Sequence, residues 1–257
     1  MIVRRAAFAI ALLLFAFSCS PNPQFIERKI AIEGRAYRYR VWLPPRYTKL
    51  RRWPVILYLH GSNERGDDNL RPLTSGLPLA LSHDPRRFRA IVVIPQCALD
   101  TEWYGEQEQQ ALAALDATIK EFRGDRRRVI LTGMSMGGAG VWYFARHPQR
   151  FAALVPVCGE VVRAADDPFP IPPPPDLAKI LASPNPYAAL AQAIGKKAVW
   201  AFHGADDAVI SVEESRRMTR AIPGARYTEY KGIGHNVWDR AYDDPALAAW
   251  MLAQRIR

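Results

Sequence analysis

Gly133-Met134-Ser135-Met136-Gly137 is the stretch from which the rest of the chain can be interpreted. It follows the apolar run 128–132 and precedes the apolar, glycine-containing run 138–146. A strand, a G-x-S-x-G turn and a helix in this order are typical of a nucleophile elbow, a turn so sharp that the serine hydroxyl projects above a parallel sheet. Glycines fit on both sides because a Cβ there would collide as strand and helix close up. The motif predicts Ser135 as the nucleophile.

An acidic residue and a histidine follow Ser135 in the chain order that this arrangement requires. Residues 198–203 read as a buried strand, and an aspartate pair lies in the loop after it. Residues 226–230 alternate like a further strand, and His235 comes shortly after them, directly after Gly232-Ile233-Gly234. Parallel sheets build their sites at the carboxyl ends of the strands. We therefore predict His235 as the general base, with an acid from the preceding loop.

The acid is Asp206 or Asp207. Acidic residues are common as turn formers and as helix N-caps. One of the two aspartates is therefore expected to be a turn former or the N-cap of the predicted helix Ser211–Ala221. We favour Asp207 as the acid that orients His235. His203, which ends the preceding strand, is expected to be packed or to support the site from behind.

Two backbone amides are needed to hold the oxyanion of an acyl-transfer intermediate. The residue after the nucleophile, Met136, supplies one of them. The other is expected from the loop after the strand Val55–Leu59, which begins His60-Gly61-Ser62. We assign this second donor to the amide of Ser62, with Gly61 as the alternative.

Five segments together resemble a known family: Leu59–Asn69, Ile94–Cys97, Leu131–Gly138, Trp200–Asp207 and Gly234–Tyr242. From about Phe25 to the C-terminus, the chain resembles bacterial predicted peptidases and carboxylesterases of the α/β-hydrolase superfamily. These are related to polyhydroxybutyrate-depolymerase-like and feruloyl-esterase-like enzymes. The resemblance puts the acid at the fifth position of the His203-Gly204 motif, which is Asp207.

The coarse layout is that of an α/β protein. An antiparallel hairpin is expected at its start, turned at Gly34, and six parallel strands after it. Their predicted ranges are Phe25–Glu33, Arg35–Leu43, Val55–Leu59, Ala90–Pro95, Val129–Thr132, Ala153–Val157, Ala198–His203 and Arg226–Tyr230. Residues 25–257 thus predict a single domain with the α/β-hydrolase fold: an eight-stranded, mostly parallel sheet with helices on both faces.

A proline-rich stretch, Val161–Pro184, follows the sixth predicted strand, Ala153–Val157. Hydrolases of this fold commonly insert a lid at this point, and Phe169 and Ile171 offer apolar side chains to an acyl group. The alternative is a surface loop that has no part in substrate choice.

The first residues predict export. Arg4 and Arg5 precede the short apolar run 6–17, which is typical of a secretory signal peptide at residues 1–18 and too short to span a bilayer. Ala16-Phe17-Ser18-Cys19 further resembles a lipoprotein box, with Cys19 as the acylated residue and residues 19–24 as a tether. We predict a periplasm-facing lipoprotein of the cell envelope, with a simple secreted form as the alternative and a lipid anchor as the only membrane contact.

Composition and motifs limit which ligands and partners are expected for this protein. The net charge is +10, but the basic residues are scattered and no nucleic-acid-binding motif is apparent, so we expect no nucleic-acid partner. The sequence contains no metal-ligand cluster or phosphate-binding glycine loop, so we expect no cofactor and no metal. Cys97 and Cys158 end strands that two other strands should separate, and we predict buried thiols rather than a disulfide. The sequence leaves the oligomeric state open.

Together these features predict a serine hydrolase that cleaves carboxylic esters, small or polymer-borne, through an acyl-serine intermediate. A serine peptidase or amidase of the same fold is the first alternative. A non-catalytic cell-envelope binding protein is the second. Acyl chain length and alcohol are not encoded in any pattern of the sequence.

Overall fold

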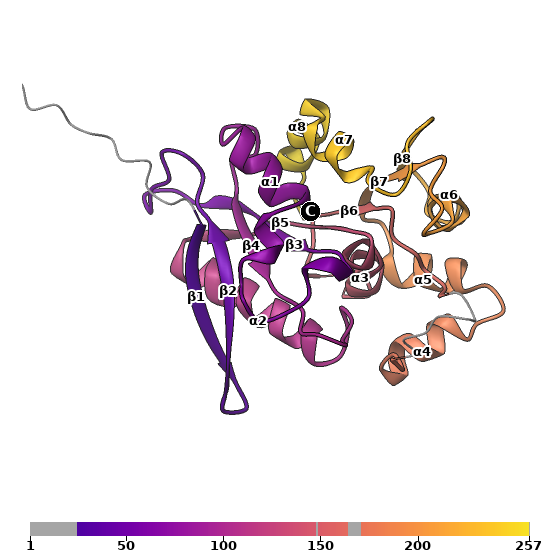
Figure 1. Ribbon diagram of the computed structural model, residues 1–257, viewed down its shortest axis with the longest axis horizontal. Helices are drawn as coiled ribbons and strands as arrows, with labels where there is room; N and C mark the ends of the chain where they lie inside the picture. The colour runs from indigo at the N-terminus through magenta and orange to yellow at the C-terminus, as the bar shows by residue number, and fades with distance from the viewer. Residues whose placement is uncertain (1–24, 148, 164–170, 257) are drawn as a thin grey trace, which may run out of the picture.

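The computed structural model describes residues 25–147, 149–163 and 171–256, which build one eight-stranded sheet (Figure 1). The strands are β1 (Phe25–Ile32), β2 (Arg35–Trp42), β3 (Trp53–Leu59), β4 (Ile91–Pro95), β5 (Gly124–Met134), β6 (Ala153–Val157), β7 (Ala198–Gly204) and β8 (Arg226–Tyr230), in the order β1-β2-β4-β3-β5-β6-β7-β8. β2 is antiparallel to both of its neighbours, and all other pairs are parallel. The predicted eight-stranded, mostly parallel sheet is confirmed.

Helices cover both faces of the sheet, as predicted. One face packs against α2 (Glu106–Glu121), α3 (Met136–Phe144), α5 (Pro186–Ile194) and α6 (Val212–Ala221). The other packs against α1 (Gly76–His83), α7 (Trp238–Asp243) and α8 (Pro245–Ala253) (Figure 1). Within β3, Val55 and Leu57 enter the first core, whereas Ile56 and Tyr58 enter the second. This alternation explains why the parallel strands read as continuous apolar runs.

Local sequence signals account for several element boundaries. Glu33 and Gly34 turn the β1–β2 hairpin with φ angles of 48° and 81°, the positive values that tight hairpin turns require. The side chain of Asp244 caps α8 by accepting a hydrogen bond from the Ala246 amide at 2.8 Å, with Pro245 in the first turn. The turn at Gly34 was expected from the sequence.

The predicted lid, residues 161–184, is only partly described, because residues 164–170 lie outside the described ranges. The structure places an additional helix, α4 (Pro175–Leu181), in its second half, where the sequence analysis expected no helix. Tyr104 Oη donates a hydrogen bond to the carbonyl of Ile171 at 2.5 Å, which joins the middle of this stretch to the body of the protein. A lid role stays a prediction.

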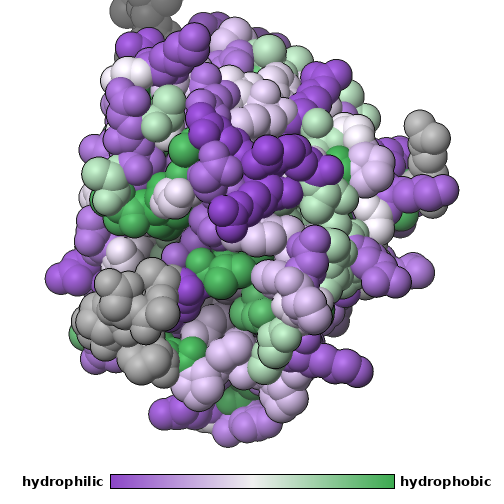
Figure 2. Space-filling model, turned by 90° about the vertical axis from the view of Figure 1, so that its right-hand side faces the viewer, coloured by the Kyte–Doolittle hydropathy of each residue, from purple (hydrophilic) through white to green (hydrophobic). Residues whose placement is uncertain are grey.

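The N-terminal predictions, a signal peptide at 1–18, acylation of Cys19 and a tether at 19–24, also lie outside the described residues. Within the described ranges, none of the helices combines the length and the apolar character needed to cross a membrane. Figure 2 shows the side of the molecule that carries α4, α5 and α6. Hydrophilic residues predominate there, and the apolar ones form separate small patches.

Candidate active site

Ser135 lies in a sharp turn between β5 and α3. Its φ angle is 53°, a left-handed value that a non-glycine residue rarely adopts, and its amide donates to the carbonyl of Val157 at 2.9 Å. A Cβ on Gly133 would come within 2.4 Å of the Gly137 carbonyl oxygen, and one on Gly137 within 2.0 Å of the Leu59 carbonyl oxygen. Only glycine permits these contacts, so the G-x-S-x-G spacing follows from the packing of the turn.

Three of the predicted site residues form one hydrogen-bonded chain. Ser135 Oγ lies 2.8 Å from His235 Nε2, and His235 Nδ1 lies 2.7 Å from Asp207 Oδ2. Because a carboxylate only accepts, Nδ1 carries the hydrogen and Nε2 is left to accept the hydrogen of the serine hydroxyl. The chain joins residues 100 and 28 positions apart in sequence, and all three follow strands at the carboxyl edge of the sheet.

Asp207, and not Asp206, makes this contact. The Asp207 side chain is fully buried, whereas Asp206 is exposed. Burial by itself would raise the pKa of Asp207, but hydrogen bonds from His203, His235 and the amides of Ile210 and Val209 outweigh burial and hold the pKa below its ordinary value. Asp207 is therefore ionised at neutral pH. Neither aspartate caps α6, because Ser211 occupies that position.

The two amides assigned to an oxyanion hole both lie at the starts of helices. Met136 is the first residue of α3, and Ser62 is the first residue of the short 3₁₀ helix η1 (Ser62–Glu64). Within the described part of the chain, neither amide donates a hydrogen bond. The loop lies close to the serine, because a Cβ on Gly61 would be 3.6 Å from Ser135 Cβ.

His60 fixes the loop that carries Ser62. Its buried imidazole donates from Nδ1 to the Gly61 carbonyl at 2.7 Å, and its Nε2 accepts from the amide of Cys97 at 2.9 Å. The Trp103 ring meets the imidazole edge to face and donates to the His60 carbonyl at 2.9 Å. A proton added at Nε2 would oppose the Cys97 N–H, so this arrangement requires neutral His60.

These contacts predict an acid-sensitive fold. Burial lowers the pKa of His60 to about 4 from its ordinary 6.5, so protons favour the unfolded chain as pH falls through this window. The free energy of unfolding should drop by up to about 3 kcal/mol between pH 7 and pH 4 from this group alone. Urea unfolding at a series of pH values measures the drop, and His60→Gln, which does not titrate, should flatten it. An equally steep dependence in His60→Gln would exclude His60 as the cause.

Cys97 and Cys158 are free and buried, as predicted. Cys158 lies next to the site. Its Sγ, one carboxylate oxygen of Asp207 and one ring nitrogen of His235 all lie within 4.8 Å of one another. Among the described residues, this is the one group of side chains close enough together to hold a metal ion. Both ring nitrogens of His235 are already engaged by Ser135 and Asp207, and burial raises the pKa of the Cys158 thiol far above neutral. We therefore assign no metal to this group.

Trp238 is a neighbour of the site that the sequence analysis missed. Its ring meets the His235 ring edge to face at 5.4 Å between centroids, from the first turn of α7. No sequence signal distinguishes it from a core aromatic residue at a helix start.

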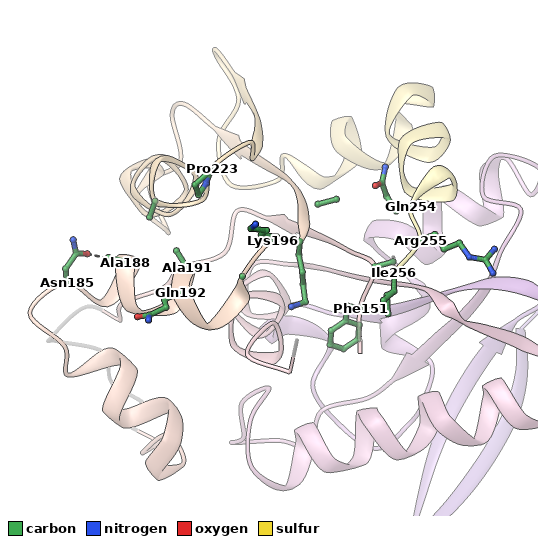
Figure 3. A pocket seen from close by; sticks show the side chains of 15 residues that line it. Phe151, Asn185, Ala188, Ala191, Gln192, Lys196, Pro223, Gln254, Arg255 and Ile256 are labelled. Carbon is green, nitrogen blue, oxygen red and sulfur yellow. Dashed lines mark hydrogen bonds between the residues drawn. The ribbon is translucent and has the colours of Figure 1, made fainter. Parts of the chain in front are cut away.

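A large cavity lies away from this site. About 1190 Å³ in volume, it is lined by residues that include Phe151, Lys197 and Ile256 (Figure 3). Phe151 lies two residues before β6, and Lys197 directly precedes β7, so the cavity lies at the amino ends of these strands, opposite to Ser135. It is therefore no part of the candidate active site.

Several solved structures share this fold. A thermostable esterase matches with a TM-score of 0.73 at 23% identity over 90% of this chain, which spans 63% of that protein. A feruloyl esterase module from Clostridium thermocellum, in complex with sinapinate, matches with a TM-score of 0.65 at 16% identity over 89% of each chain. The fluorophosphonate-binding serine hydrolase FphF from Staphylococcus aureus matches with a TM-score of 0.63 at 18% identity, over 89% of this chain and 98% of that one. Identities this low show a common fold.

Sequence comparison gives the family. No curated protein matches the chain. The family model of the dienelactone hydrolases, however, matches residues 87–243, more than half of the chain, and this range includes Ser135, Asp207 and His235. The chain thus belongs to the dienelactone hydrolase family of the α/β-hydrolase superfamily.

Proposed function

We propose that this protein is a serine esterase that hydrolyses carboxylic esters through an acyl-serine intermediate. The observation that carries the proposal is the hydrogen-bonded chain Ser135–His235–Asp207, together with the nearby backbone amide of Met136, which donates no hydrogen bond within the described residues. The names of the similar structures, an esterase, a feruloyl esterase module and a serine hydrolase, support it.

In the proposed mechanism, His235 Nε2 takes the Ser135 proton as Oγ attacks the ester carbonyl. Asp207 holds the imidazole in the required tautomer and stabilises the imidazolium that forms. The imidazolium then protonates the departing alkoxide, which leaves as the alcohol and an acyl-Ser135. His235 Nε2 next takes a proton from water as the water oxygen attacks the acyl carbonyl. It returns this proton to Ser135 Oγ when the acyl–Oγ bond breaks and the acid leaves. The residues described supply every proton transfer in this sequence.

The oxyanion is assigned to the amides of Met136 and Ser62. Both amides stand at helix N-termini, where the backbone N–H groups have no partner within the helix and the helix dipole favours negative charge. A Cβ on Gly61 would crowd the Glu64 side chain, with Oε2 at 3.1 Å, and would be in van der Waals contact with Ser135 Cβ at 3.6 Å. Fixed donors of this kind lower the barrier without having to reorganise during the reaction.

The proposal is tested with a fluorophosphonate probe and a substrate panel. The purified protein should be labelled at Ser135, as mass spectrometry of the tryptic peptides would show. Turnover should be highest for p-nitrophenyl or aryl esters such as feruloyl esters, and low for aminoacyl amides. Higher kcat/KM for the amides would instead indicate a peptidase. Folded protein that neither reacts with the probe nor turns over any ester would support a non-catalytic binding protein.

We also propose that residues 1–18 direct export and that Cys19 carries the lipid anchor, because a basic start, a short apolar run and a cysteine follow one another there. The protein should then fractionate with membranes, and Cys19→Ala should release it into the soluble fraction. Mass spectrometry of the mature N-terminus checks acylation directly. An unmodified N-terminus at another residue would overturn the anchor while leaving export in place.

A further inference from the structure

A second histidine contacts the acid of the site from behind. His203 is fully buried near the end of β7. Its Nε2 lies 3.1 Å from Asp207 Oδ2 and 3.1 Å from the carbonyl oxygen of Ile210, and its Nδ1 lies 2.7 Å from Ser215 Oγ. Nothing in the reaction itself uses this imidazole, and yet all of its polar atoms are engaged.

The hydrogen-bond partners of the His203 imidazole determine which of its ring nitrogens carries the hydrogen. Nε2 faces a carboxylate and a carbonyl, neither of which can donate, so Nε2 carries the hydrogen. Nδ1 then accepts from the hydroxyl of Ser215, a buried residue of α6. The imidazole thus delivers one N–H to the same carboxylate oxygen, Asp207 Oδ2, that receives the Nδ1–H of His235.

Asp207 is held at both of its oxygens. Oδ1 accepts from the amides of Val209 and Ile210 at 2.8 and 2.9 Å, while Oδ2 accepts from His203 and His235. Without His203, Oδ2 would keep His235 as its only partner, and His235 is the ring that changes charge during the reaction. His203 is therefore the donor to Oδ2 whose charge does not change during the proposed reaction.

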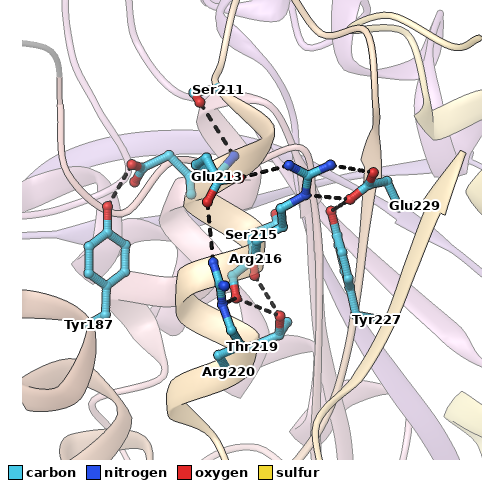
Figure 4. A network of polar contacts seen from close by, with 10 residues as sticks. Tyr187, Ser211, Glu213, Ser215, Arg216, Thr219, Arg220, Tyr227 and Glu229 are labelled. Carbon is cyan, nitrogen blue, oxygen red and sulfur yellow. Dashed lines mark hydrogen bonds and ion pairs between the residues drawn. The ribbon is translucent and has the colours of Figure 1, made fainter. Parts of the chain in front are cut away.

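Ser215, the partner of His203 Nδ1, belongs to α6, and side-chain contacts fix this helix to the sheet. Arg216 forms a two-pronged ion pair with Glu229 on β8, at 2.8 and 2.6 Å, and a third contact with Glu213 at 2.7 Å (Figure 4). Tyr227 Oη donates to the same Glu229 at 2.8 Å. Ser215 directly precedes Arg216 in α6 (Figure 4), so these ion pairs also hold Ser215, the partner of His203 Nδ1 at 2.7 Å, in place.

We infer that His203 is a positioning residue for Asp207: it locks the carboxylate in the orientation that His235 needs and lowers the basicity of the oxygen facing His235. This inference rests on the proposed function and deepens it. A donor that orients a ligand or a charge partner in this way is worth about 10- to 100-fold in metal sites, and a similar factor is expected here.

The direction of the pH effect follows from the charge on Asp207. Removing the His203 N–H concentrates negative charge on Oδ2, which stabilises protonated His235, so the acid limb of kcat/KM should move to higher pH. Among the described residues, Cys158 and Glu229 are two further titratable groups that interact with Asp207 and with His203, respectively. Burial keeps the Cys158 thiol protonated by raising its pKa, and the hydrogen bond from Arg216 lowers the pKa of Glu229 to about 2. Neither changes charge between pH 4 and 8.

The test compares two variants of similar size. His203→Leu removes the donor, whereas His203→Gln keeps an N–H near the position of Nε2. In His203→Leu, kcat for an activated ester should fall about 10- to 100-fold with KM within about twofold, and the acid limb should rise by on the order of half to one pH unit. His203→Gln should recover most of kcat and the wild-type limb. Complete titration with a fluorophosphonate gives the concentration of competent sites.

A purely structural role for His203 would lower the number of titratable sites and leave kcat per site and the acid limb unchanged, and that result would overturn the inference. If His203→Leu does not fold, ¹⁵N imidazole NMR of the wild-type protein decides: His203 must show the Nε2–H tautomer, and its signals must shift in Asp207→Asn. The opposite tautomer or unmoved signals would refute the contact. Wild-type protein without esterase activity would overturn the proposed function and this inference with it, whereas an active wild type with an unaffected His203→Leu overturns this inference alone.

Discussion

Replacing Ser135 with alanine should lower kcat for an activated ester by about a millionfold, the order of loss seen when the nucleophile of a catalytic triad is removed. Among the described residues, the Oγ of Ser135 hydrogen-bonds to His235, and its loss deletes the attacking atom. Alanine keeps the Cβ, and the left-handed backbone at this position is already present with serine. The thermal midpoint should therefore remain within a few degrees of wild type.

The measurement is ester hydrolysis by the purified variant, with circular dichroism as the check on folding. Ser82→Ala, at an exposed position in α1, is the matched control and should retain full turnover. Near-normal turnover in Ser135→Ala, at matched purity, would place the nucleophile elsewhere and end the serine mechanism.

Asp207→Asn should lower kcat by about ten-thousandfold, as expected when the orienting acid of a triad becomes an amide. Each oxygen of Asp207 receives two N–H donors: Oδ1 from Val209 and Ile210, Oδ2 from the two histidines. An asparagine has one carbonyl oxygen, so either of its orientations turns an NH₂ group toward donors. Facing His235, the amide would force the wrong tautomer; facing the loop amides, it would loosen the turn.

Stability should fall in this variant too, by about 1–3 kcal/mol, because buried donors lose their acceptor. Asp206→Asn is the adjacent control. Its side chain is exposed, and the hydrogen bond from residue 206 to the Ile233 carbonyl comes from the backbone and survives the change. Kinetics per titrated site, with urea unfolding alongside, separate the two effects. A larger loss of kcat in Asp206→Asn than in Asp207→Asn would transfer the role of the acid to Asp206.

The order of strands and turns was accessible from the sequence because each signal is local. The glycines around Ser135, the positive-φ turn at Gly34 and the Asp244-Pro245 helix start each reflect backbone geometry within a few residues. The apolar runs of the parallel strands are equally local. A helix within 175–181 was missed, because a run of prolines at its start reads as extended chain although proline is well suited to the first helical turn.

The sequence by itself determined the fold, the position of Ser135 in its elbow and the loops that carry Asp207 and His235, because sharp turns and buried strands restrict which residues can occupy them. The sequence favoured Asp207 over Asp206 by its family resemblance, and the tertiary structure gave the physical reason: the Asp207 side chain points inward and is buried, whereas Asp206 is exposed. The tertiary structure alone showed that His203 bonds to Asp207 and that Trp238 packs on His235. Such contacts depend on how β7, α6 and α7 pack together, and packing across the sheet leaves no periodic signal in the chain.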